Sequence, residues 1–185
     1  LPISLPRTTT RWKVIRLLAL DTATNCGWAA WHPNTGMTSG AQSFKPGRGE
    51  SPGMRFLRFR KWLSEMIDLV KPSVIAYERS GHFKGVAAAE VCHGFQTIMH
   101  EEAARREIDT APVQNSELKK YATGKGNAGK PEMIKAARKR WKVDLTEKEH
   151  DRADALCVLA WALNEIGADP LPRLRPRIVA KRIRG

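Results

Sequence analysis

The fold is decided near the C-terminal end by the stretch Glu149–Leu163, which reads EHDRADALCVLAWAL. Asp151 and Asp154 are three residues apart, so a helix places both side chains on one face, with Cβ atoms about 5–6 Å apart. From Ala155 onward the stretch is apolar on nearly all sides, which is typical of a buried helix. Two carboxylates pressed toward a core need a compensating partner, and a divalent cation is the obvious candidate.

The same stretch also has a purely structural interpretation. Thr146–Glu149 has the form of a capping box, and the positive end of a helix dipole favours acids in the first turn. If Thr146 caps the helix, however, Asp151 lies beyond the first turn, where the dipole explains it less well. A metal shared with acids elsewhere in the chain then accounts better for the pair.

Composition points to a single domain with a polyanionic partner. The chain has 185 residues and a formal net charge of +13, which attracts nucleic acid or an anionic membrane. A membrane is the weaker choice, since no run of 18 or more apolar residues occurs. Cys26, Cys92 and Cys157 are far apart and lack zinc-site spacing. They predict free thiols in a reducing compartment, with Cys92 and Cys157 as small core residues.

The two ends differ from the middle in composition. We expect a flexible basic lead-in at 1–12, one folded domain at 13–168 and a basic, disordered tail at 169–185. The tail's basic residues are Arg173, Arg175, Arg177, Lys181, Arg182 and Arg184. The tail either lies along a polyanion or is simply solvated. The start is basic and acid-free but lacks the apolar region of a signal peptide. We expect a cytoplasmic protein of a bacterial or phage-infected cell, with organellar import left open.

The first strand ends in an acid. The apolar run Val14–Leu20 is followed by Asp21 and a turn, and the chain resumes at Trp28–Trp31 and again at Thr38–Phe44. This pattern predicts a buried strand with antiparallel neighbours. Asp21 is either a turn acid that bonds its own backbone or a metal ligand at a strand end.

A second strand repeats the arrangement. Apolar residues recur at helical spacing over 54–70, and the short run after Pro72 ends at Glu78. A helix between two strands favours a crossover with parallel pairing, which places both strand ends at one edge of the sheet. Ligand sites in such sheets lie beyond the carboxyl ends of the strands. Asp21 and Glu78 are therefore expected to be neighbours.

The rest of the domain is predicted to be mostly helical. A long helix follows Gly85, and its alanine-rich opening suits packing on its own sheet or against a second subunit; the sequence leaves both open. A strand at 108–113, a short helix at 115–121 and a helix at 131–141 follow.

A glycine and lysine loop separates the last two of these helices. The loop 123–130 is not a phosphate-binding Walker A loop, because Pro131 stands where Ser or Thr is required. Its lysines nevertheless suit contact with nucleic-acid phosphates, or the loop is simply exposed. The lysines in and before it are Lys119, Lys120, Lys125 and Lys130.

Four acids converge if the last helix packs near the strand ends. Their mutual repulsion requires cations. Two metal ions held by carboxylates can activate water and stabilise the leaving oxygen in phosphodiester hydrolysis. Oxygen-only ligands suit Mg²⁺, or Mn²⁺ in its place, better than zinc. His150 is either a general base or a helix-surface residue, and we favour the surface slightly.

The motifs resemble those of RuvC-type Holliday junction resolvases, in order and spacing, over residues 17–163. They are LALD at 18–21 with Gly27, IAYE at 75–78, GKGNAGK at 124–130 and DRADAL at 151–156. The resemblance implies a ribonuclease-H-like α/β fold with a mixed sheet, antiparallel in its first three strands and then parallel, flanked by helices. It also implies a homodimer and Mg²⁺-dependent, paired nicking of four-way DNA junctions.

The resemblance assigns roles to individual residues. The catalytic and metal-binding acids would be Asp21, Glu78, Asp151 and Asp154, with two ions per site. DNA contacts would come from the four lysines, from Arg79 and from an aromatic wedge at Phe83, where Gly81-His82 is an insertion. The turn after Asp21 lacks the family's usual Pro-Gly, and the arginine tail is an addition. This divergence favours a phage or mobile-element relative.

Other functions stay open at this stage. A nuclease of the same fold could act on other branched DNA or on RNA–DNA hybrids, and a non-catalytic DNA-binding protein would use the basic surface alone. An actin-like kinase also begins with strand, Asp and glycine turn, but it needs a far longer chain.

Overall fold

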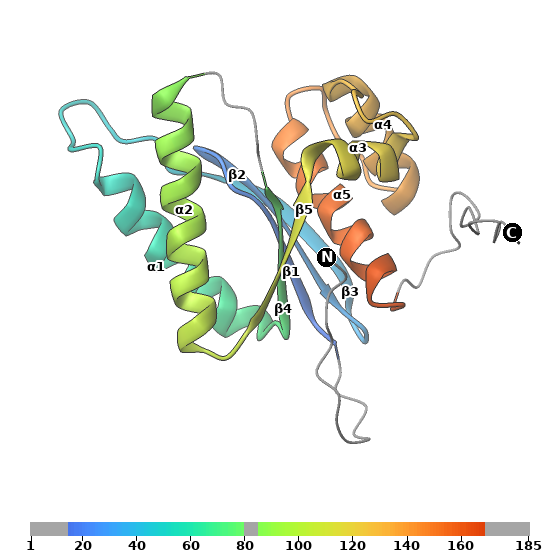
Figure 1. The fold of residues 1–185 in the computed structure, drawn as a ribbon, viewed down its shortest axis with the longest axis horizontal. Helices are drawn as coiled ribbons and strands as arrows, with labels where there is room; N and C mark the ends of the chain where they lie inside the picture. The colour runs from blue at the N-terminus through green and yellow to red at the C-terminus, as the bar shows by residue number, and fades with distance from the viewer. Residues whose placement is uncertain (1–14, 80–84, 169–185) are drawn as a thin grey trace, which may run out of the picture.

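A mixed five-stranded sheet forms the centre of the molecule (Figure 1). The computed structural model describes residues 15–79 and 85–168. The strands are β1 Leu17–Asp21, β2 Asn25–His32, β3 Gly36–Ser43, β4 Val74–Arg79 and β5 Asp109–Gln114. Their order is β3-β2-β1-β4-β5; β1–β2 and β2–β3 are antiparallel, whereas β1–β4 and β4–β5 are parallel. The predicted mixed sheet is confirmed.

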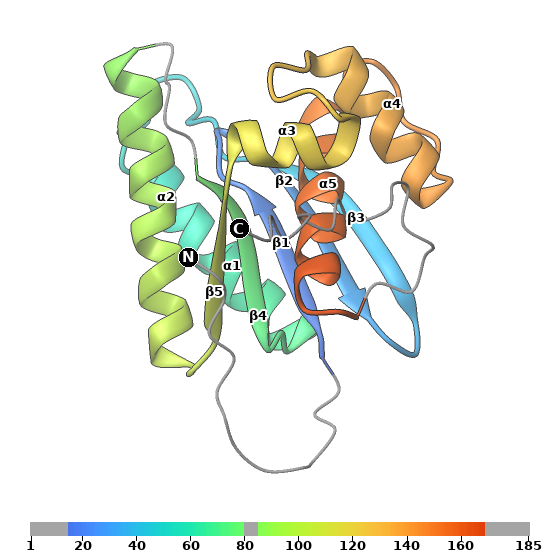
Figure 2. The same cartoon turned by 45° about the vertical axis from the view of Figure 1, so that its right-hand side comes forward.

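Helices cover both faces of this sheet. They are α1 Met54–Val70, α2 Val86–Arg105, α3 Asn115–Thr123, α4 Lys130–Trp141 and α5 His150–Glu165. Figures 1 and 2 show α1 and α2 on one face and α5, with α3 and α4, on the other. Leu17 and Ala19 of β1 belong to the core under α5, and Leu18 and Leu20 to the core under α1 and α2. Successive side chains of a strand point to opposite faces of the sheet, so a strand buried on both faces contributes to two cores.

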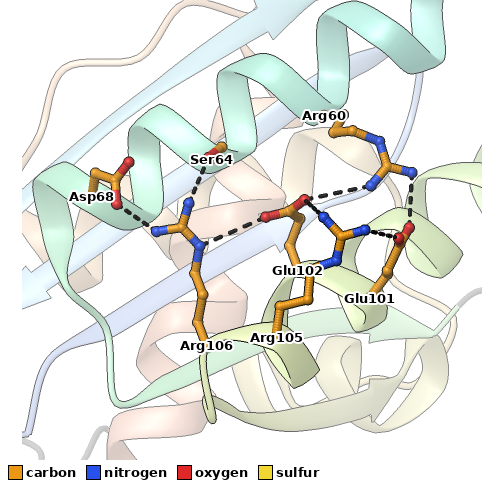
Figure 3. A network of polar contacts seen from close by, with 7 residues as sticks. All are labelled: Arg60, Ser64, Asp68, Glu101, Glu102, Arg105 and Arg106. Carbon is orange, nitrogen blue, oxygen red and sulfur yellow. Dashed lines mark hydrogen bonds and ion pairs between the residues drawn. The ribbon is translucent and has the colours of Figure 1, made fainter.

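Charged side chains tie α1 to α2 (Figure 3). Glu102 is only 5% exposed. Its carboxylate lies 3.4 Å from a guanidinium nitrogen of Arg60 and 3.6 Å from Nε of Arg106. Arg106 also donates to Ser64 and Asp68 of α1, so the network joins the C-terminal end of α2 to the second half of α1. A buried acid of this kind is tolerated because several cations compensate it.

The start of α5 differs from the prediction. The helix begins at His150 with Glu149 as its N-cap, so Thr146 is not the cap. The Glu149 carboxylate accepts hydrogen bonds from both the amide and the hydroxyl of Thr146, at 2.8 and 3.0 Å. The Thr146 hydroxyl therefore donates to Glu149 and does not cap the first amides of α5. The capping-box residues Thr146–Glu149 form a turn that precedes the helix. Asp151 lies in the first turn after all, where the helix dipole also favours it.

The alanine-rich opening of α2 does not pack on its own sheet. Val86 is 77% exposed, and Ala87 and Ala88 are exposed as well. Of the two alternatives, only contact with a second subunit still stands as a prediction. All three cysteines are free, as expected, and the predicted burial of Cys92 and Cys157 is confirmed; Cys26 is buried as well. The lead-in, the tail and the domain boundaries drawn there lie outside the described residues. Within the described ranges, no helix combines the length and hydrophobicity needed to cross a bilayer.

Candidate active site

Two of the four acids lie side by side at the end of the parallel strands. Asp21 is the last residue of β1, and Glu78 is the second last of β4. The parallel pairing of β1 with β4 ends at Leu20 and Tyr77, so each acid is one residue beyond the last pair. The predicted neighbourhood of Asp21 and Glu78 is confirmed by this register.

The helix α5 brings the other two acids to the same edge, because it packs across β1 and β2. Its first turn lies against Gly27, the β2 partner of Asp21: a Cβ atom on Gly27 would be 1.9 Å from the main-chain oxygen of Asp151. Only glycine leaves room for this approach. The first turn of α5 is thus held beside the end of β1, and Asp154 follows on the next turn.

Burial and the charges of neighbouring acids raise the pKa of two of the four carboxylates. Burial raises the pKa of Asp21 well above its ordinary value, and the charges of Asp154, Glu78 and Asp151 raise it further. Burial, followed by the charges of Glu78 and Asp151, raises the pKa of Asp154 to about 7. Lys130 opposes both shifts. Groups that resist ionisation in this way lie close together and lack sufficient positive charge.

Two of the acids have polar partners of their own. Glu78, 9% exposed, accepts a hydrogen bond from the Asn115 amide at the start of α3. Asp151 Oδ1 lies 2.9 Å from His150 Nδ1, and His150 Nε2 lies 3.1 Å from Lys130 Nζ. The lysine ammonium can only donate, so His150 accepts at Nε2 and donates from Nδ1 to Asp151. Both ring nitrogens are therefore occupied.

The donor set suits a hard divalent cation. All four candidate ligands are carboxylates, which Mg²⁺ and Mn²⁺ prefer, and the raised pKa of Asp21 and of Asp154 signals missing positive charge. Within residues 15–79 and 85–168, no three His, Cys, Asp or Glu side chains already form a ready ligand set. The contacts of Glu78 with Asn115 and of Asp151 with His150 account for part of this. Binding an ion would require these carboxylates to reorient.

A cleft of about 340 Å³ opens beside the acids. Asp21, Glu78 and Asp151 are among its lining residues. The turn 22–25 and the α2 residues Ala88, Val91 and Cys92 line the rest. The candidate site is therefore accessible to a ligand as well as acidic.

The lysines divide into two groups. Lys130 lowers the pKa of both Asp21 and Asp154, and Lys119 lowers that of Asp154, so these two belong to the site. Lys125 instead pairs with Glu132 at 3.2 Å, and Lys120 is exposed on α3. Arg79 is exposed at the end of β4. Phe83 lies outside the described residues.

Two residues at the site were missed by the sequence interpretation. Asn115 was assigned only to a short helix, and Gln96 to the long helix after Gly85. Asn115 could have been found, because it directly follows β5 at the edge where the acids lie. Nothing in the local sequence distinguishes Gln96. Its side-chain nitrogen contacts the Thr22 hydroxyl, the main-chain oxygen of Glu78 and Cys92 Sγ.

Sequence comparison finds relatives among curated resolvases, although no family model matches the chain. The crossover junction endodeoxyribonuclease RuvC of Paenarthrobacter aurescens strain TC1 is 32% identical over 104 residues, 56% of this chain and 55% of that protein. The RuvC protein of Prochlorococcus marinus subsp. pastoris is 28% identical over 120 residues, 65% of this chain and 76% of that protein. The chain spans little more than half the length of the first relatives it matches.

Structure comparison agrees with the sequence match. T. thermophilus RuvC in complex with a Holliday junction substrate superposes with a TM-score of 0.68 and 16% identity, covering 83% of this chain and 97% of that one. The yeast mitochondrial Holliday junction resolvase Ydc2 gives a TM-score of 0.52 and 13% identity, over 81% and 78% of the two chains. At sequence identities this low, the structural match is evidence for a shared fold alone. The resemblance to RuvC-type proteins is thus confirmed, and the chain has their ribonuclease-H-like fold.

Proposed function

We propose that this protein is a metal-dependent, structure-selective endodeoxyribonuclease that resolves four-way DNA junctions by paired hydrolysis of phosphodiester bonds. One observation carries the proposal: four carboxylates from β1, β4 and α5 gather at the open edge of a RuvC-like sheet, where burial and the neighbouring charges raise the pKa of Asp21 and of Asp154. A structural cluster of acids would be neutralised by arginine, as Glu102 is, whereas Asp21, Glu78 and Asp151 line a cleft.

The four acids Asp21, Glu78, Asp151 and Asp154 would hold two Mg²⁺ ions, and Mn²⁺ can substitute. When bound, such ions activate a water molecule and stabilise the leaving oxygen of the scissile phosphodiester. The protein contributes the fixed positions of the acids: two at strand ends, two on one face of a buried helix.

The lysines and His150 have different tasks from the acids. Lys119 and Lys130, beside the carboxylates, would contact the phosphates that flank the cleaved bond, and Lys120, Lys125 and Arg79 would contact the backbone farther away. His150 is better suited to orient Asp151 than to act as a general base, because Nε2 accepts from Lys130 and Nδ1 donates to Asp151.

A homodimer is part of the proposal. Paired nicks in a junction require two active sites, and one chain carries one carboxylate cluster in its described part. The exposed opening of α2 offers an apolar surface for a second copy. The cytoplasm of a bacterial or phage-infected cell is the proposed location, in keeping with bacterial relatives and three free thiols.

Cleavage of synthetic DNA tests the proposal. A four-way junction, a flap and an RNA–DNA hybrid are incubated side by side with the full chain in Mg²⁺ or in excess chelator. We expect paired nicks in the junction that require Mg²⁺, and binding without cleavage for Asp154→Asn. The exposed Asp144→Asn serves as a matched control with unchanged activity.

Each other outcome has a defined meaning. Cleavage that persists in excess chelator contradicts the metal-dependent mechanism. Preferred cleavage of the flap or of the hybrid identifies a different substrate for the same site. Junction binding without cleavage by the unmodified chain favours a DNA-binding protein.

A further inference from the structure

One amide side chain from α2 contacts both the turn after β1 and the end of β4, next to two of the candidate metal ligands. Gln96 Nε2 lies 3.1 Å from the hydroxyl of Thr22, which follows Asp21. The same nitrogen lies 3.2 Å from the main-chain oxygen of Glu78 and 3.4 Å from Cys92 Sγ. The carbonyl of Glu78 can only accept, which directs the NH₂ group, and not the amide oxygen, toward the sheet.

This contact lies where the backbone stops joining the two strands. The pairing between β1 and β4 ends at Leu20 and Tyr77. Asp21 and Glu78 therefore lie beyond the last pair. Gln96, from α2, connects the two segments with one hydrogen bond to Thr22 and one to the main chain of Glu78. Its partner Thr22 is 4% exposed, and Thr22 Oγ1 also lies 3.6 Å from Cys92 Sγ, so the contact is embedded in the protein.

We propose that Gln96 is a positioning residue for the candidate ion site: its amide fixes the separation between the turn after Asp21 and the end of β4. The inference rests on the proposed metal-dependent cleavage. Gln96 touches neither an ion nor DNA; it acts through the main chain of Glu78 and the residue next to Asp21. Loss of a hydrogen-bonding partner behind metal ligands typically weakens metal binding 10- to 100-fold.

Direct ion binding gives the decisive measurement. Mn²⁺ is titrated calorimetrically into the metal-free full chain, and junction cleavage is followed against Mg²⁺ concentration. Gln96→Leu, which keeps the bulk but removes the amide, is expected to raise the Kd for Mn²⁺ and the half-saturating Mg²⁺ concentration about tenfold. Cleavage at saturating Mg²⁺ should stay close to that of the unmodified chain, because the ligands themselves remain.

Further variants separate positioning from folding. Gln96→Glu keeps the length but turns a carboxylate oxygen toward the Glu78 carbonyl, so it should weaken Mn²⁺ binding at least as much. Thr97→Ala, on the same helix and exposed, is the matched control and should leave the Kd unchanged. If Gln96 acts through Thr22, Thr22→Val combined with Gln96→Leu will weaken binding less than the sum of the single effects.

The failures are distinguishable. A Gln96→Leu protein that melts at a lower temperature yet binds Mn²⁺ within about twofold of the unmodified chain overturns the positioning role alone. An unmodified chain that binds no Mn²⁺ and cuts no junction overturns the proposed function and this inference with it.

Discussion

Gly27 of β2 lies directly against the main-chain carbonyl of Asp151 at the start of α5. An added Cβ atom would be 1.9 Å from that oxygen and 2.4 Å from its carbon. The obstacle is backbone, not a flexible side chain, so a larger residue must displace the first turn of α5. That turn carries one candidate metal ligand and precedes another.

Gly27→Ala is therefore expected to damage both stability and cleavage. Overpacking should lower the free energy of unfolding by about 2 kcal/mol. A displaced Asp151 should reduce junction cleavage by about 100-fold, the typical result of an ångström-scale misplacement. Urea unfolding and single-turnover cleavage measure the two effects. Gly53→Ala, whose Cβ would come no closer than 3.6 Å to another atom, is the control. Equal behaviour of both variants would contradict the packing argument.

The raised pKa of Asp154, about 7, predicts a pH-dependent stability without divalent ions. The folded protein keeps this proton up to neutral pH, whereas the unfolded chain releases it near pH 4, so stability falls as pH rises through this range. Asp154→Asn removes the ionisation. At pH 8 it should raise the free energy of unfolding by about 2 kcal/mol, with allowance for partial exposure. Below pH 4 the gain should vanish. A gain independent of pH in chelator-containing buffer would exclude this cause.

Glu102 is expected to stabilise the packing of α1 on α2. Glu102→Ala removes the buried partner of Arg60 and Arg106 and should lower the free energy of unfolding by about 2 kcal/mol. Glu65→Ala breaks only an exposed pair with Lys61 and should cost less than about 0.5 kcal/mol. Denaturant titration compares the two, and comparable losses would refute a special role for Glu102.

His150 should prove less important than a general base. Because both ring nitrogens are already engaged, His150→Gln is expected to reduce cleavage about tenfold at most, through poorer orientation of Asp151. Loss of a general base would cost about 100- to 10,000-fold. Rates at saturating Mg²⁺ discriminate between these ranges, and a loss in the upper range would restore His150 as the base.

Salt dependence of junction binding tests the lysines. Lys119→Ala and Lys130→Ala should each reduce the slope of log affinity against log salt by about one, because each removes a phosphate contact. Lys61→Ala, on the opposite face of the sheet, should leave the slope unchanged. Fluorescence anisotropy in Ca²⁺ or chelator avoids cleavage. An effect of Lys61→Ala equal to the others would mean nonspecific attraction by net charge.

Local sequence patterns predicted much of this architecture. The runs ending at Asp21 and Glu78 are hydrophobic over a strand's length, and the helix between them implies parallel pairing; the sheet confirms both. The helix at 54–70 is found with the same bounds. The predicted start of α5 was wrong because Glu149 and Thr146 form hydrogen bonds with each other in a turn. A four-residue sequence pattern cannot distinguish this turn from a capped helix.

The site was predictable only as far as strand topology reaches. Convergence of Asp21 and Glu78 follows from parallel pairing, whereas the approach of Asp151 depends on the absent side chain of Gly27 in a distant strand. Asn115 and Gln96 reach the acids through contacts between elements far apart in the chain. Such contacts require the packed structure, and no local periodicity encodes them.

Because α5 is buried, the candidate site should unfold only when the whole domain unfolds. Every residue from Ala155 to Leu163 is buried, and two of the four acids, Asp151 and Asp154, lie on the first turns of that same helix. Backbone amides in such a helix exchange with solvent only when the domain opens globally. Partial unfolding of peripheral segments would leave the carboxylates in place, so a protease that trims exposed segments should spare them. Denaturation should therefore abolish ion binding and the slowest amide protection in a single transition.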